Sequence, residues 1–241
     1  MTVNGRNLQP VSLWIGCDYT SFGQSLANLV CERSAAAHID HSMTIQRLNV
    51  DELAKMGYMR TDPLASTQFT YTRFLVPYLC NYTGYAVFCD NDFVWESDPM
   101  ELIRKYTDPT KAVSCVKHQY SQCPSSSKMN GVPQVWYPRK NWSSMMVFNC
   151  AHPSCRNLTL DAINTRPAAW LHRMEWCSDD EIQSVPHEYN YLVGYYHDRV
   201  PKAIHYTDGG PWYKDYQNVE FATNWYRWTT EDERSHLASI F

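Results

Sequence analysis

The chain has 241 residues, of which 44% are hydrophobic and 14% aromatic, and its formal net charge is −4. One compact domain or two small ones fit this length, and one domain over residues 1–241 is favoured because the apolar content can build a shared core. The slightly acidic balance, with no basic run, argues against nucleic acid as the main partner.

The cysteines predict a reducing environment. There are nine of them, an odd number, and no CxxC occurs. Several of them, including Cys89 and Cys150, fall inside apolar runs. The first ten residues are polar and no apolar run is long enough to span a bilayer, so we expect neither a secretory leader nor a transmembrane segment. These features predict reduced core thiols in a soluble, cytoplasmic protein.

Strands and helices are expected to alternate along the chain. Alternation of this kind predicts an α/β fold, in which ligands bind at the carboxyl ends of the strands. The hydrophobic spacing predicts strands over 10–17, 42–50, 85–89, 112–116, 144–149 and 202–207, helices over 21–34, 51–57, 66–79, 157–164 and 178–184, a helix starting at Asp98, a helical tail from 216, and a long loop over 121–141.

The stretch GYAVFCDNDFVW ends a buried strand with Asp90 and Asp92, one residue apart. Two carboxylates this close repel each other unless a cation lies between them. Hard oxygen ligands at a strand end suit Mg²⁺ or Mn²⁺, above all when a diphosphate supplies further oxygens. The alternative is an ordinary turn with exposed aspartates.

Three further sets of residues are candidates for a site. His205 lies in an apolar strand just before a Gly209-Gly210 turn that offers backbone N–H groups to an anion, although a lone histidine of this kind is more often part of the core. Arg73 lies among aromatic residues, from where its guanidinium could contact a diphosphate or simply stack. The acidic cluster 179–181 stands at an expected helix start, where capping is the simpler explanation.

Four blocks together carry a resemblance to a known family. They are STQFTYTRFLVPYL, GYAVFCDNDFVWESDP, YPRKNWSSMMVFN and AIHYTDGGPW, in that order. They resemble the GT-A-fold glycosyltransferases related to family 8, and most closely bacterial and viral sugar transferases of that kind. The resemblance covers most of the chain between residues 11 and 215. It implies a Rossmann-like mixed sheet flanked by helices, with a nucleotide-binding half over 11–95, an acceptor half that includes the metal histidine over 96–215, and a tail over 216–241.

The resemblance also implies roles for individual residues. Asp90, Asp92 and His205 would hold the metal ion, and Arg73 would contact the diphosphate or the sugar. The family's Asp-Gln-Asp is here Asp179-Asp180-Glu181, so Asp180 and Glu181, together with Arg73, are the candidate catalytic residues. The lysine that many members carry before the Pro-Trp is missing here. The implied contacts with the nucleotide sugar are Gly16, Asp18, Tyr19, Arg73, Asp90, Asn91, Asn141, Gly209 and Gly210.

The implied reaction is metal-dependent transfer of a hexosyl group from a nucleotide-diphosphate donor, expected to be a UDP-sugar, to a hydroxyl of a glycan, glycolipid or glycoprotein. Mn²⁺ or Mg²⁺ would offset charge on the leaving diphosphate. Family relatives retain the anomeric configuration, and retention is expected here. The loop 121–141 is expected to close over the donor.

Two classes of protein remain as alternatives. A phosphohydrolase of the haloacid dehalogenase type also has a strand that ends in DxD, but it needs a second acidic motif after another apolar strand. A non-catalytic carbohydrate-binding protein would use the aromatic residues without the metal ligands, and it would keep binding glycan after loss of Asp92.

Overall fold

The computed structural model describes residues 11–40, 42–59, 69–119, 131, 137–198 and 200–241, together with the backbone of the short strands β1 (Thr2–Val3), β2 (Arg6–Asn7), β8 (Ser127–Lys128) and β9 (Val132–Pro133). Most of the predicted loop 121–141, and the lid function expected of it, lie outside the described residues.

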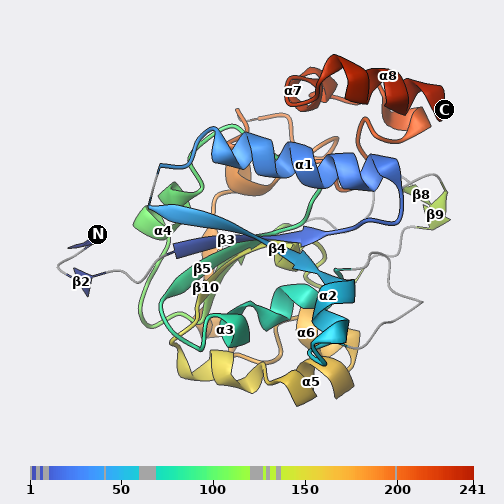
Figure 1. Cartoon of the computed structure of the whole chain (residues 1–241). Coiled ribbons are helices and arrows are strands. Elements are labelled where there is room, and N and C mark those ends of the chain that lie inside the picture. The colour runs from blue at the N-terminus through green and yellow to red at the C-terminus, as the bar shows by residue number, and fades with distance from the viewer. Residues whose placement is uncertain are drawn as a thin grey trace.

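A six-stranded mixed sheet forms the centre of the molecule (Figure 1). The strand order is β11-β7-β10-β5-β3-β4, and every neighbouring pair is parallel except the two pairs that β10 makes. The parallel strands therefore all end at one edge of the sheet. The strands are β3 (Val11–Cys17), β4 (Met43–Asn49), β5 (Tyr85–Cys89), β7 (Val113–Val116), β10 (Met145–Asn149) and β11 (Ile182–Val185).

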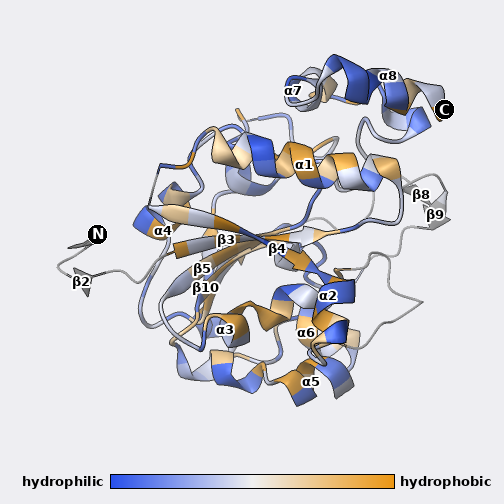
Figure 2. Ribbon diagram, in the orientation of Figure 1, coloured by the Kyte–Doolittle hydropathy of each residue, from blue (hydrophilic) through white to orange (hydrophobic). Residues whose placement is uncertain are grey.

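Helices cover both faces of this sheet. Helix α1 (Phe22–Ala36) lies on one face, with Ser21 capping its first turn by accepting a hydrogen bond from the Gln24 backbone N–H. On the other face lie α2 (Val50–Lys55), α3 (Val76–Leu79), α5 (Leu160–Thr165) and α6 (Ala168–His172). Strands covered on both faces are apolar throughout, and β10, with the sequence MMVFN, is buried at every position. Figure 2 shows this apolar centre between more polar outer elements.

A second, three-stranded sheet has the order β12-β13-β6. Its strands are β12 (Tyr191–Leu192), β13 (Ala203–His205) and β6 (Phe93–Trp95). Strand β6 begins directly after the Asp90–Asp92 segment, and its antiparallel pairing with β13 sets His205 opposite Phe93. This register brings the predicted metal histidine to the aspartates.

The C-terminal residues form two helices, α7 (Ala222–Tyr226) and α8 (Glu231–Ser239), on the outer side of α1 (Figure 1). Arg33 of α1 pairs with Glu233 of α8 at 2.8 Å, and the rings of Phe22 and His236 meet edge to face. A helical tail was predicted from residue 216, and the structure confirms it as two helices packed on the fold.

All six predicted strands are confirmed, but one predicted helix is wrong. Residues 178–184 form a short 3₁₀ turn over Asp179–Glu181 and then strand β11, which pairs in parallel with β7. The reciprocal capping of Ser178 and Glu181 imitates a helix start, but the chain extends once Ile182 and Val185 can be buried at the end of the sheet.

Smaller differences occur elsewhere. The predicted helix 157–164 is a 3₁₀ turn over Pro153–Asn157 followed by α5. In the described part of 66–79, a 3₁₀ turn over Thr72–Leu75 leads into α3, where Pro77 lies in the first turn and does not end the helix. Helix α4 (Met100–Lys105) follows Asp98 as expected, whereas β6, β12 and α6 were not predicted.

The eight cysteines within the described residues are all free thiols, and six of them are buried, as the sequence predicted. Among the described residues, none of the helices has the length and apolar content needed to cross a bilayer.

Candidate metal centre

Three predicted ligands converge at the edge where the parallel strands end. Asp90 and Asp92 follow β5, and His205 ends β13 of the smaller sheet. One ligand atom from each lies within 4.8 Å of the other two. An ion that binds at ~2.0–2.6 Å can bridge two atoms up to ~5 Å apart, so these three atoms fit one shared ion. Two carboxylates and an imidazole are a donor set that suits Mn²⁺ or Mg²⁺.

The three side chains are held with little exposure. Nε2 of His205 lies 3.3 Å from Oδ2 of Asp92, and the two side chains are 2% and 8% exposed. The imidazole stacks on Phe93, with ring centroids 4.4 Å apart. The backbone N–H of Tyr206 donates to the Asp92 carbonyl, and that of Asp90 donates to the Ser144 carbonyl. The backbone thus fixes Asp92 to the residue directly after β13 and Asp90 to the residue directly before β10, which belong to two different sheets.

Arg73 supplies positive charge to this centre. Its guanidinium pairs with Asp90 at 3.0 Å and donates to the Ser143 carbonyl at 2.8 Å. It also lies over the rings of Phe69 and Phe88, at 5.7 and 5.1 Å from their centroids. The alternatives of a phosphate contact and of a stacked, ion-paired arginine are therefore compatible, because the aromatic and carbonyl contacts hold the guanidinium beside the metal ligands.

Asn91 turns away from the metal ligands. Its amide donates to Oδ1 of Asn28 at 2.8 Å and to Oε1 of Gln24 at 3.0 Å, both on α1. Asn28 in turn bonds the backbone N–H and carbonyl of Asp18, at the end of β3. This buried network ties the first strand end to the aspartate pair, and it assigns Asn91 a bracing role that the sequence did not predict.

The residues expected to hold the base and ribose lie around the end of β3. The Asp18 carboxylate accepts from both the backbone and the hydroxyl of Thr20, and Tyr19 is 41% exposed. Gly16 is needed for packing, because a Cβ there would lie 2.7 Å from the Phe69 ring. Of this group, Tyr19 is the side chain most open to a ligand.

The Gly209-Gly210 turn follows His205 closely. Gly209 has φ +133, and its N–H donates to the Tyr206 carbonyl. A Cβ at Gly210 would lie 2.1 Å from the Trp212 ring, so the indole occupies that space. Asn141, with φ 63, donates from its amide to Oγ1 of Thr207 at 3.0 Å, which brings the third resemblance block against the fourth.

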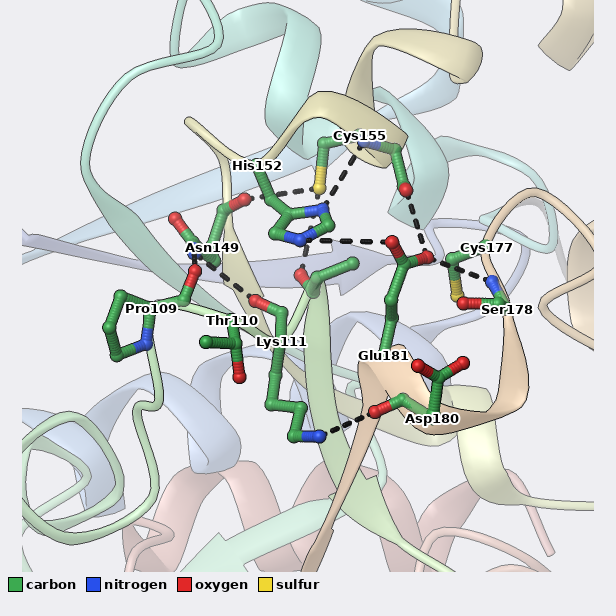
Figure 3. Close-up of polar contacts among 12 residues, drawn as sticks. Pro109, Thr110, Lys111, Asn149, His152, Cys155, Cys177, Ser178, Asp180 and Glu181 are labelled. Carbon is green, nitrogen blue, oxygen red and sulfur yellow. Dashed lines mark hydrogen bonds and ion pairs between the residues drawn. The ribbon is translucent and has the colours of Figure 1, made fainter.

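Asp180 and Glu181 lie at the opposite edge of the sheet from the metal ligands. Figure 3 shows them beside Ser178 and Lys111. They precede β11, whereas the metal ligands follow β5, and β11 is three strands away in the order. With ~4.8 Å between strands and ~3.3 Å per residue, the two places are ~20 Å apart. The catalytic role predicted for both residues requires a place beside the metal ligands, and their position in the sheet is not compatible with it.

Both carboxylates are engaged where they are. Hydrogen bonds from Ser178 hold the pKa of Glu181 and of Asp180 below the ordinary values. Glu181 also accepts from Ser154 Oγ at 2.9 Å, and the Asp180 carbonyl accepts from Lys111 Nζ at 2.6 Å. A lowered pKa is the reverse of what a general base near neutral pH requires. A phosphohydrolase of the haloacid dehalogenase type needs a second acidic motif close to the DxD aspartates. The cluster 179–181 was the candidate for that motif, and its place at the opposite edge argues against this alternative.

Two buried residues that the sequence did not single out lie at the edge of the sheet where the metal ligands lie. Asn190, fully buried in the connection between the sheets, contacts Nδ1 of His205 at 2.8 Å. His118, two residues beyond β7, contacts the Tyr196 hydroxyl at 2.7 Å, and burial together with His205 and His187 lowers its pKa well below the usual range. Neither has a local sequence signal, because each acts through contacts far along the chain.

Protein CDI of Arabidopsis thaliana is 38% identical to this chain over 227 residues, which cover 90% of this chain and 85% of that protein. The chain belongs to the family of Protein CDI. No protein-family model matches the chain.

Solved glycosyltransferase structures show the same architecture. The bifunctional glycosyltransferase WbbM aligns with a TM-score of 0.61 at 14% identity over 99% of this chain. GlyE of Streptococcus pneumoniae aligns at 0.60 and 12% over 98%. The galactosyltransferase LgtC, solved with donor and acceptor sugar analogues, aligns at 0.51 and 9% over 93%. This CDI-family chain spans only 52% of the WbbM chain and 64% of GlyE. The likeness confirms the predicted GT-A fold, with Asp90 and Asp92 at a strand end.

Proposed function

We propose that this CDI-family chain is a metal-dependent glycosyltransferase. It takes a hexosyl group from a nucleoside-diphosphate donor, with a UDP-sugar as the expected form, and passes it to a hydroxyl of a glycan, glycolipid or glycoprotein. The observation that carries the proposal is the convergence of Asp90, Asp92 and His205 within 4.8 Å at the carboxyl edge of a GT-A sheet. Membership of family 8, the nucleotide-binding and acceptor halves, and a cytoplasmic location remain predictions.

The side chains at this edge have distinct tasks in the proposal. Asp90, Asp92 and His205 would hold Mn²⁺ or Mg²⁺, which when bound supplies charge that offsets the negative charge growing on the leaving diphosphate. Arg73 already sits beside Asp90, so it can donate to a phosphate oxygen without a large movement. Asn141 and the Gly209-Gly210 turn complete the proposed donor contacts, and Tyr19 would contact the nucleoside.

Retention of configuration remains the expected outcome. An inverting displacement needs a protein base beside the acceptor hydroxyl, within ~2.6–3.2 Å. Asp180 and Glu181 were the candidates for that base, and their place at the opposite edge removes their support for inversion. A retaining transfer in which the donor's own phosphate oxygen takes the proton needs no such residue. Proton NMR of the first product from an α-linked donor tests this, and a β-linked product contradicts it.

A thermal-shift screen with Mn²⁺ and a panel of nucleoside diphosphates tests the proposed function. We expect UDP with Mn²⁺ to raise the melting temperature of the wild type and to leave that of Asp92→Asn unchanged. Asp161→Asn is the matched control, because Asp161 lies exposed in the first turn of α5, and it is expected to respond like the wild type. Sugar transfer that continues in EDTA contradicts the metal scheme, and glycan binding without transfer that survives Asp92→Asn favours a carbohydrate-binding protein.

A further inference from the structure

A histidine binds a metal ion through a ring nitrogen that carries no proton, so the tautomer of His205 decides whether it can be a ligand. Nε2 of His205 faces Asp92 at 3.3 Å, and Nδ1 faces Oδ1 of Asn190 at 2.8 Å. Proton positions follow from the partners of each nitrogen. The partners here form a chain of hydrogen bonds with only one consistent direction.

The chain begins at a backbone carbonyl. The Ser144 hydroxyl lies 2.7 Å from the Asn141 carbonyl oxygen, which can only accept, so the single hydroxyl proton points there. Asn141 is held in the left-handed region at φ 63, at the start of the 3₁₀ turn that ends at Ser144. The position of this carbonyl is therefore set by local backbone geometry.

The next contact fixes the amide of Asn190. Its Nδ2 lies 2.9 Å from Ser144 Oγ. Because the Ser144 hydroxyl already donates its only proton to the Asn141 carbonyl, Oγ can only accept at this contact. The reverse orientation of the amide would set two acceptor oxygens against each other. Oδ1 of Asn190 therefore faces His205, and because an amide oxygen can only accept, Nδ1 of His205 carries the proton.

We propose that Asn190 is a positioning residue that holds His205 in the Nδ1–H tautomer. The lone pair of Nε2 is then directed to the proposed metal site beside Asp92. The metal part of this inference rests on the proposed function, and the tautomer part does not. Asn190 is fully buried at the end of a 3₁₀ turn between β11 and β12, so one amide joins the two sheets that supply the ligands. Partners of this kind commonly contribute 10–100-fold to metal affinity.

The tautomer is tested by NMR of protein labelled with ¹⁵N in histidine, recorded about two pH units above the ordinary histidine pKa of ~6.5. The His205 signals are assigned by their loss in His205→Gln. We expect a pyridine-like Nε2 and a protonated, pyrrole-like Nδ1 in the wild type, with and without Mg²⁺. A wild-type spectrum that shows the proton on Nε2 overturns the inference. This measurement needs no variant at Asn190.

Mn²⁺ alone is the probe for the second readout, measured by titration of the purified full chain. We expect Asn190→Leu to weaken Mn²⁺ binding about 10–100-fold and to shift His205 toward a mixture of tautomers. Asn190→Asp keeps an acceptor for Nδ1–H, and its other oxygen can accept from the Ser144 hydroxyl once that proton turns away from the Asn141 carbonyl, so Mn²⁺ affinity is expected to stay within about threefold of the wild type. The control is Asn149→Leu, because Asn149 is a buried asparagine whose amide bonds the Pro109 and Lys111 carbonyls at the opposite edge (Figure 3).

The outcomes separate the two proposals. Wild-type protein that binds no Mn²⁺ contradicts the metal-dependent function, while the NMR pattern still decides the role of Asn190. Mn²⁺ binding that Asp92→Asn abolishes and Asn190→Leu leaves unchanged supports the function and overturns the positioning role. If Asn190→Leu fails to fold, Ser144→Ala takes its place, and an unchanged single tautomer in that variant counts against the chain of hydrogen bonds.

Discussion

Replacing Arg73 by Met tests how the metal centre balances its charges in the absence of metal. The Arg73 and Asp90 side chains are only 7% and 14% exposed, and their nearest atoms are 3.0 Å apart. Two charges ~4 Å apart at an effective dielectric constant of ~20 attract by about 4 kcal/mol, and removing one partner of a buried pair costs about 3–5 kcal/mol. We therefore expect Arg73→Met to lower the free energy of unfolding by about 3–5 kcal/mol in EDTA.

The assay is urea denaturation in EDTA and in Mn²⁺. Because Asp90 no longer faces a guanidinium in the variant, Mn²⁺ is expected to stabilise Arg73→Met more than the wild type, and a concentration of about 100 times the Kd stabilises by about 2.7 kcal/mol. The double variant Arg73→Met/Asp90→Asn is expected to recover at least about 2 kcal/mol of the loss, since the carboxylate charge that needed the partner is gone.

Arg33→Met provides the control, because Arg33 pairs with Glu233 at the surface and its side chain is 38% exposed. Such pairs contribute about 1 kcal/mol or less. An Arg73→Met variant that is no less stable than Arg33→Met in EDTA refutes the charge balance. A double variant in which the two losses simply add refutes the pairing of Arg73 with Asp90.

Three further substitutions give separate tests. Burial lowers the pKa of His172 to about 3, so below pH ~6.5 the unfolded chain binds a proton that the folded protein does not, and the free energy of unfolding falls on acidification. In urea titrations, His172→Gln is expected to lose about 1–2 kcal/mol less of its free energy of unfolding between pH 8 and pH 5 than the wild type. Equal losses in the two proteins contradict this expectation. Gly210→Ala places a Cβ 2.1 Å from the Trp212 ring and is expected to cost about 1–3 kcal/mol, so an unchanged melting temperature would mean that the indole can move. Asn91→Asp sets a carboxylate oxygen against the Gln24 and Asn28 oxygens in place of two donated hydrogen bonds, and it is expected to lower the free energy of unfolding by about 2–3 kcal/mol. The affinity for Mn²⁺ is expected to fall less than tenfold. A variant as stable as the wild type argues against the bracing role.

The sequence predicted the centre of the fold well because its strands are buried on both faces. Strands β3, β5 and β10 are short apolar runs bounded by polar residues, and this pattern needs no knowledge of partners. The strand-end position of Asp90 and Asp92 followed from the same pattern. Strand β6 was missed because it has only three residues and pairs with β13, which lies far along the chain.

The misplacement of Asp180 and Glu181 has a different cause. A resemblance transfers a residue by its place in the sequence, whereas its place in the sheet depends on which strand follows it and in which direction. Residues 178–181 carry a capping pattern that predicts a helix, and only the pairing of β11 with β7 shows that they precede a strand. Asn190 shows the converse, because its importance comes from Ser144 and His205 and not from its neighbours in sequence.

The joining of two sheets at the metal centre also affects how the chain is made. Asp90 and Asp92 emerge from the ribosome before His205 and the strand that carries it, which come more than a hundred residues later. At ~5–20 residues per second, synthesis leaves an interval on the order of ten seconds in which the aspartates exist without their histidine. A growing chain therefore passes through a stage in which the six-stranded sheet has only part of its strands and a cation could be held only weakly. In the proposed metal-dependent scheme, tight metal binding requires the strand that carries His205, and a ribosome-bound chain halted before His205 is expected to lack it.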